Sequence, residues 1–210
     1  MIKLSESQDP DYDFVQSLLV IDRAKKIWLY NIEGENIDFK NLDYVPGFKL
    51  EMANSFGVTS DGSMMFVGTS NGCLAEFNLQ SPNIELTKNY YQVHEGAICK
   101  IKVSNDNQFF FTADDFGNLT KWSIAEQREV GYLDRISDGR ITHIIISNDG
   151  LYLCTVDVEN RLKQFDINDF TLLKDYGMIG DSNDGQEPIY FADISPDSKW
   201  MVVYNKFKQI

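Results

Sequence analysis

The sequence is poor in the residues that most often carry covalent or metal chemistry, with three cysteines and two histidines in 210 residues. Cys73, Cys99 and Cys154 lack CxxC spacing, and an odd number cannot pair completely within one chain. We therefore expect reduced core thiols in an intracellular compartment. The N-terminus lacks the apolar stretch of a signal peptide, and no apolar run approaches the roughly 18 residues of a membrane span. These absences predict a soluble cytoplasmic protein.

Positive charge is also scarce. The chain has 19 Lys and Arg against 32 Asp and Glu, which gives a formal net charge of −13. A polyanion would be repelled rather than bound through counterion release, so we expect no direct nucleic-acid partner and no membrane partner. The expected partners are other proteins, and basic segments suit this charge.

Sequence patterns of catalysis are missing. No GxSxG, P-loop, HExxH or GxGxxG pattern occurs. The acidic stretch Asp181 to Glu187 has its glycine at the fifth position, whereas a calcium loop of the EF-hand type requires glycine at the sixth. His94 and His143 fall in different parts of a repeat pattern, and we expect both to be structural. The sequence thus predicts no catalytic residue, no metal site and no cofactor.

A repeat is what the sequence does contain. One series of markers is a serine before a polar turn: Ser5, Ser60, Ser104, Ser147 and Ser195. The first interval is 55 residues, and the later intervals are 43 to 48 residues. A second series is an aromatic residue near the end of a later apolar run, at intervals of 43 to 47 residues: Tyr30, Phe77, Trp122 and Phe165. Because the two series are independent and keep the same period, they indicate a structural repeat of about 40 to 45 residues.

Each repeat has the apolar pattern of short strands, as in SMMFVGTS, QFFFTADD and LYLCTVDV. Turn signals such as Asp61-Gly62 and Pro196-Asp197 separate these runs. A more polar outer strand such as REVGYLDRI brings each repeat to four strands, which is one blade of a β-propeller. We predict an all-β fold, a β-propeller of four-stranded antiparallel blades with about four complete blades and an incomplete terminal one. Their approximate ranges are 1–50, 51–93, 94–138, 139–186 and 187–210.

Three of these segments, VHEGAICKIKVSNDN…LTKWSI, SDG…LAEFNL and SNDG…LKQFDI, resemble the WD repeat. In that family a histidine-containing turn leads the first strand and a Trp-Asp pair ends the third. The resemblance implies structural roles for His94, Ser104 and the aromatic series Tyr30, Phe77, Trp122 and Phe165. Only His94 matches the leading histidine, and Asn31, Asn78 and Ser123 replace the aspartate after the aromatic residue. We therefore expect the family's Asp–His–Ser–Trp network to be incomplete in every blade, with apolar packing holding the blades together.

The turns that would share one face of such a propeller are rich in acidic residues. We expect a negatively charged docking face there, with Phe116 as its exposed apolar anchor and Arg140 as a hydrogen-bond donor. Its acidic members are Glu95, Asp114, Asp115, Asp157 and Glu159. The alternative interpretation of these turns is an ordinary solvated rim.

These features predict a non-enzymatic scaffold or adaptor that offers a rigid platform for protein–protein interaction in a larger assembly. Two rival functions stay open: a propeller enzyme with carboxylates around a central site, and a propeller subunit of an RNA-processing complex. Family analogy suggests a cilium or another large assembly as the location. An open arc leaves strand edges unpaired, so we expect further blades or a partner chain to cover its ends, the alternative being a small ring closed by irregular pairing.

Overall fold

The computed structural model of the chain describes residues 2–3, 16–21, 27–31, 37–40, 52–80, 84–179 and 188–205. These residues form eighteen strands and no α-helix, so none of their elements is a helix that could cross a membrane. The strands are β1 (Ile2–Lys3), β2 (Gln16–Ile21), β3 (Ile27–Asn31), β4 (Ile37–Lys40), β5 (Ala53–Val58), β6 (Met64–Thr69), β7 (Leu74–Asn78), β8 (Glu85–Tyr90), β9 (Ile98–Val103), β10 (Phe109–Asp114), β11 (Leu119–Ser123), β12 (Arg128–Leu133), β13 (Ile141–Ile146), β14 (Tyr152–Asp157), β15 (Arg161–Asp166), β16 (Leu172–Met178), β17 (Ile189–Ile194) and β18 (Met201–Asn205).

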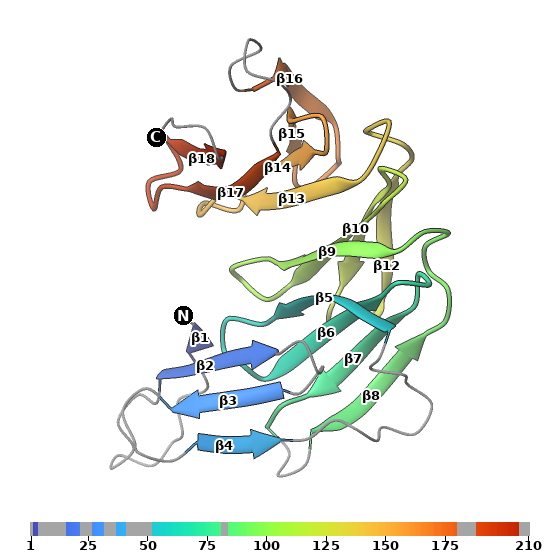
Figure 1. Cartoon of the computed structure of the whole chain (residues 1–210), viewed down its shortest axis with the longest axis vertical. Coiled ribbons are helices and arrows are strands. Elements are labelled where there is room, and N and C mark those ends of the chain that lie inside the picture. The colour runs from blue at the N-terminus through green and yellow to red at the C-terminus, as the bar shows by residue number, and fades with distance from the viewer. Residues whose placement is uncertain are drawn as a thin grey trace.

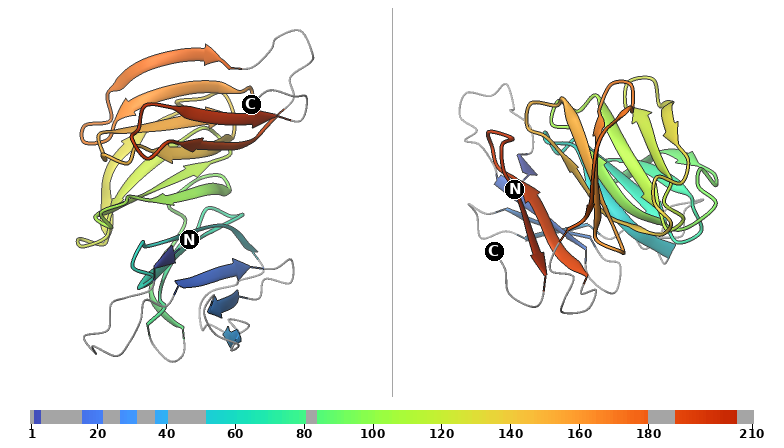
Figure 2. Two further views of the ribbon diagram at one scale, coloured as in Figure 1. Left: turned by 90° about the vertical axis from the view of Figure 1, so that its left-hand side faces the viewer. Right: turned by 90° about the horizontal axis from the view of Figure 1, so that it is seen from above.

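The strands form four antiparallel meanders of four strands each, followed by a hairpin of two. The sheets are β1–β4, β5–β8, β9–β12, β13–β16 and β17–β18, each with its strands in chain order. The prediction of an all-β chain of four-stranded blades is confirmed. The sheets follow one another along an arc that does not close among the described strands (Figure 1; Figure 2).

The first strand of each of the last three sheets lies beside the first strand of the sheet before it. β5 contacts β9, β9 contacts β13, and β13 contacts β17. The fourth strands β8, β12 and β16 lie at the far edge of their sheets. This is the radial order of a propeller blade, in which the first strand is innermost and the fourth is outermost.

Apolar side chains fill the spaces between the last four sheets. Phe110 points toward the β5–β8 sheet, where its ring stacks on that of Phe66 with centroids 4.0 Å apart. Phe111 points to the opposite face and joins the cluster shared with the β13–β16 sheet. The run Phe109 to Phe111 thus serves both faces of one strand, as the alternation of a β-strand predicts.

A hydroxyl group closes the turn between the first and second strands of each of the last four sheets. The Ser104 Oγ accepts a hydrogen bond from the Phe109 backbone N at 3.0 Å. Ser147 and Ser195 bind the residue five positions later in the same way. In the β5–β8 sheet Thr59 takes this role, with its Oγ1 3.0 Å from the Met64 N. The choice of Ser60 as the repeat marker is therefore wrong by one residue, although the period is unaffected.

Candidate interaction face and the network beneath it

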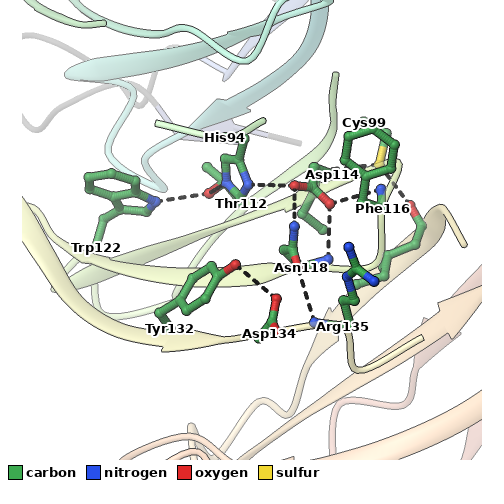
Figure 3. A network of polar contacts seen from close by, with 12 residues as sticks. His94, Cys99, Thr112, Asp114, Phe116, Asn118, Trp122, Tyr132, Asp134 and Arg135 are labelled. Carbon is green, nitrogen blue, oxygen red and sulfur yellow. Dashed lines mark hydrogen bonds and ion pairs between the residues drawn. The ribbon is translucent and has the colours of Figure 1, made fainter. Parts of the chain in front are cut away.

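A continuous chain of hydrogen bonds joins β10 and β11 to the turn that precedes β9. The Trp122 Nε1 donates to the Thr112 Oγ1 at 2.9 Å, and Thr112 Oγ1 lies 2.7 Å from the His94 Nε2 (Figure 3). The His94 Nδ1 lies 3.0 Å from the Asp114 Oδ2. Indole can only donate and carboxylate can only accept, so a neutral imidazole that donates from Nδ1 gives every group a partner. The expectation that this network is incomplete in every blade is wrong, because Thr112 replaces the family's serine.

Asp114 also closes the turn between β10 and β11. Its Oδ1 accepts hydrogen bonds from the backbone N of Phe116 at 3.0 Å and of Asn118 at 2.9 Å. Burial alone raises the pKa of the Asp114 carboxyl, but the hydrogen bonds from His94 and Asn118 outweigh it and hold this pKa below 3.8. The side chain of Asp114 is completely buried, so the prediction that Asp114 belongs to an exposed docking face is wrong. Asp114 instead fixes the turn that carries Phe116.

The β13–β16 sheet repeats the turn without the histidine and the tryptophan. The Asp157 Oδ1 accepts hydrogen bonds from the backbone N of Glu159 and of Arg161, both at 2.9 Å. Its Oδ2 accepts one from the Ser137 Oγ at 2.8 Å, so a serine stands where His94 stands in the preceding sheet. Asp157 is buried, and its proposed place among the exposed docking residues is also wrong.

The turn after the second strand also needs a residue with positive φ. Gly72 and Gly117 have φ values of 78° and 84°, and a Cβ on either would collide with the carbonyl oxygen of the incoming turn, that of His94 or Ser137. In the third copy Asn160 adopts a φ of 61°. Asparagine tolerates this region better than other non-glycine residues. The turn that leads into each of these later sheets therefore packs directly against the turn after the second strand of the sheet before it.

Three predicted docking residues, Glu95, Asp115 and Phe116, lie close together at these packed turns. Phe116 is 51% exposed and Glu95 is exposed, while Asp115 is half-buried. A Cβ on Gly96 would collide with the Asp115 carboxylate and with the Phe116 ring, so Gly96 packs directly beneath them. The Asp115 N also donates to the Ala97 carbonyl at 3.1 Å.

The other two predicted docking residues belong to the next turn along the arc. Glu159 forms an ion pair of 3.1 Å with Arg161, which also lies 3.8 Å from the exposed Asp138. Arg140 is exposed, and its backbone carbonyl accepts a hydrogen bond from the Val158 N at 3.0 Å. The exposed side chains thus form two neighbouring groups, one around Phe116 and one around Glu159.

Sequence analysis missed Thr112 and Ser137 as network residues, and it missed Tyr132 of β12 and Asp134, which follows this strand. The exposed Tyr132 donates its hydroxyl to Asp134 at 3.3 Å beside this network (Figure 3). The signal for Thr112 was present, since Thr-x-Asp occurs in equivalent strands as TAD and TVD. Ser137 had no such signal, because its role depends on a turn that comes after the outer strand.

Two cysteine thiols among the described residues have raised pKa values. Burial raises the pKa of the Cys99 thiol to about 12, and its Sγ contacts the carbonyl oxygens of Ala113 and Ile141 at 3.2 and 3.1 Å. Burial likewise raises the pKa of Cys154 to about 12. Within the described ranges, no group of three or more His, Cys, Asp or Glu side chains could hold a metal ion. The stretch Asp181 to Glu187 lies outside the described residues.

Comparison with known proteins finds similarity to proteins built of WD repeats. The chain is 30% identical to cilia- and flagella-associated protein 57 of Mus musculus over 105 residues, which cover 45% of this chain and 8% of that protein. It is 27% identical over 109 residues to the WD repeat-containing protein 55 homologs of Drosophila persimilis and Drosophila pseudoobscura pseudoobscura. That alignment covers 52% of this chain and 21% of each relative, so the chain spans a small part of their length.

No protein-family profile matches the chain. The fold and the relatives nevertheless point the same way. The sheets have the strand order of propeller blades, and one sheet carries the complete Asp–His–Thr–Trp network. The chain therefore resembles the WD-repeat β-propeller proteins in its repeats, its strand order and its side-chain network.

Proposed function

We propose that this chain is a non-enzymatic scaffold that holds other proteins in a larger assembly. The observation that carries the proposal is the stack of turns in which buried carboxylates hold exposed side chains in place. Asp114 holds the turn of Phe116, and Asp157 holds the turn of Glu159. Preorganised side chains bind with a smaller entropic cost than mobile ones, which suits a platform for recognition.

The proposed partner is a basic segment with an apolar side chain. Glu95 and Asp115 place negative charge beside Phe116, and the whole chain carries a net charge of −13. Complementary charge would speed encounter, while Phe116 would provide the apolar contact that resists dissociation. By analogy with the mouse relative, whose name refers to cilia and flagella, the proposed location is the cytoplasm or a ciliary assembly.

A triple substitution on this face tests the proposal. Glu95→Lys, Phe116→Ala and Glu159→Lys together reverse its charge and remove its apolar anchor without touching the buried network. We expect co-purification of bound proteins from the native cell extract, measured by mass spectrometry, to fall at least about tenfold.

A matched control changes the same charge at exposed positions outside these two groups. Glu126→Lys, Asp149→Lys and Leu151→Ala replace two acids and one exposed apolar side chain. This variant should retain its partners. Equal retention of partners by both variants, with unchanged circular dichroism, would remove the Phe116 and Glu159 groups as the docking face.

A further inference from the structure

Asp115 carries a carboxylate that the fold of its turn does not require. The Asp115 backbone N donates a hydrogen bond to the Ala97 carbonyl at 3.1 Å. In the neighbouring sheets the backbone N of Ser70 and of Val158 makes the same bond to the incoming turn, at 2.8 and 3.0 Å. A serine and a valine thus serve at this position. The carboxylate of Asp115 is therefore available for a role outside the turn.

The Asp115 carboxylate is also poorly solvated. Its Oδ1 is buried and has no hydrogen-bond partner among the described residues. None of the ion pairs in this part of the chain includes Asp115. A carboxylate oxygen that has left water without gaining a donor is costly to the folded state. Such a carboxylate gains more from an incoming cation than a fully hydrated one does, because less water has to be removed.

The Phe116 ring lies directly beside this carboxylate. A Cβ on Gly96 would lie 2.0 Å from the Asp115 Oδ1 and 2.9 Å from the Phe116 Cδ2, so both groups flank the same glycine. The Phe116 side chain is 51% exposed, at the turn that Asp114 holds (Figure 3). One carboxylate and one exposed aromatic ring thus border the same small area of the surface.

A guanidinium group matches this pair better than an ammonium group does. It is planar, so it can lie against an aromatic ring while its N–H groups point at a carboxylate. It is also more weakly hydrated than an ammonium group, so its removal from water costs less. The methylene groups of an arginine would in addition cover apolar parts of the Phe116 ring.

The next turn along the arc lacks this combination. Val158 stands there at the position of Asp115, and Glu159 stands at that of Phe116. Glu159 already forms an ion pair of 3.1 Å with Arg161. Among the described turns that follow a second strand, only that of Asp115 combines an aromatic ring with a carboxylate that has no ion pair.

We propose that Asp115 and Phe116 bind an arginine side chain of a partner protein, with its guanidinium group paired to the carboxylate and stacked on the ring. This inference rests on the proposed scaffold function and names the residue that the basic partner segment presents. Glu95 is exposed next to the same Gly96 and adds negative charge. A lysine binds here more weakly, because its ammonium group is a compact charge without a planar face.

Two short peptides, acetyl-Gly-Arg-Gly-amide and acetyl-Gly-Lys-Gly-amide, test this preference. They carry the same charge and differ only in the cationic group. In amide NMR spectra of the full chain, we expect the arginine peptide to shift the signals of Gly96 and Phe116 in a saturable way. The lysine peptide should bind at least about threefold more weakly.

Three protein variants locate the binding. Asp115→Val, which copies Val158, should weaken the arginine peptide at least about tenfold without a lower melting temperature, because a buried oxygen without a partner is removed. Glu129→Val removes the same charge at an exposed position of β12 and should bind as the unchanged chain does. Phe116→Leu should bind both peptides equally, because the aromatic face is lost.

Four outcomes would overturn the proposal: no saturable shift, equal affinity of the unchanged chain for the two peptides, unchanged binding by the Asp115→Val variant, or a Phe116→Leu variant that still prefers arginine. A lower melting temperature of Asp115→Val would also overturn it, because the carboxylate would then be structural.

Co-purification separates this inference from the scaffold proposal. If the Asp115→Val variant keeps partners that the triple variant loses, the docking face stands and the arginine site is overturned. If the triple variant keeps its partners while the unchanged chain binds the arginine peptide as expected, the scaffold proposal fails and the arginine site stands.

Discussion

The β9–β12 and β13–β16 sheets share one strand order but differ in what holds them internally. In the first, His94, Thr112 and Trp122 extend the bonds of Asp114 across β10 and β11 and the turn that precedes β9. In the second, Ser137 binds Asp157, and the apolar Phe165 stands at the position of Trp122. Both sheets nevertheless form four paired strands.

The feature common to both sheets is the carboxylate that accepts two backbone N–H groups of the following turn. Asp114 and Asp157 do this with nearly equal distances. The β5–β8 sheet does a reduced version with a hydroxyl, since the Thr69 Oγ1 accepts from the Cys73 N at 2.9 Å. Both sheets therefore depend on a hydrogen-bonded turn after their second strand. The histidine and the tryptophan add a polar connection within one of the two sheets.

Among the substitutions that test this comparison, removal of either carboxylate should lower the free energy of unfolding the most. Asp114→Ala leaves His94 and Asn118 buried without their acceptor, so we expect a loss of about 3 kcal/mol in the free energy of unfolding. Asp157→Ala loses the Ser137 hydroxyl and two backbone bonds, for which about 2 kcal/mol is expected. Urea denaturation, together with hydrogen exchange of each sheet, measures both. Equal losses in the two variants would show that His94 adds nothing to the turn.

The matched threonines give the next largest effect. Thr112→Val removes the oxygen that binds both His94 and Trp122, and it leaves two buried polar groups without a partner, at a cost of about 2 kcal/mol. Thr155 has the same position in β14, where Ser137 and Phe165 stand in place of His94 and Trp122. Thr155→Val should therefore change the free energy of unfolding by less than about 0.5 kcal/mol. A similar cost at both positions would contradict the network as a source of stability.

A substitution that makes one sheet more like the other should have a smaller effect on the free energy of unfolding. Trp122→Phe gives the β9–β12 sheet the aromatic type of the β13–β16 sheet and removes one hydrogen bond to Thr112, which His94 still binds. The edge-to-face contact with Tyr90, at a centroid distance of 5.5 Å, is reduced rather than lost. We expect a loss of about 1 kcal/mol in urea denaturation, with the sheet retained by circular dichroism. A loss as large as that of Asp114→Ala would mean that the tryptophan is the main support of the sheet.

The strand order was predictable because it follows from local patterns. Alternating apolar runs and turn residues recur with one period, and the aromatic series marks the third strand in all four complete sheets. Among the described residues the repeat marker failed at Ser60, because Thr and Ser hydroxyls close the same turn and Thr59 precedes it directly. Ser5 lies outside the described residues.

The side-chain network and the docking face were less predictable because they depend on contacts between distant residues. Thr112 was overlooked because the family has a serine there, although either hydroxyl provides the same donor and acceptor. Asp114 and Asp157 were assigned to the surface because acidic residues in turns are usually exposed. Their burial follows from the turn from the preceding outer strand, which covers them with His94 and Ser137.

A fall in pH should distinguish the turn of Asp114 from the turn of Thr69. Its effect should be the smallest of those expected here, because no side chain is truncated. The pKa of Asp114 lies below 3.8 in the folded chain because hydrogen bonds to its charged form outweigh burial. A group with a lowered folded-state pKa stabilises the fold fully above its ordinary pKa and loses that contribution as the pH falls through the folded-state value. We therefore expect the amide NMR signals of Phe116 and Asn118 to shift as the pH falls below about 3.8.

The turn of Thr69 is the internal control for this titration. The Cys73 amide binds a hydroxyl, which does not ionise in this range, so its signal should stay constant while that of Asn118 moves. Asp114→Asn should abolish the movement at Asn118 because the amide has no proton to gain there. If Cys73 shifted in parallel with Asn118, the cause would be a change of the whole domain, and the turn carboxylate would not be the titrating group.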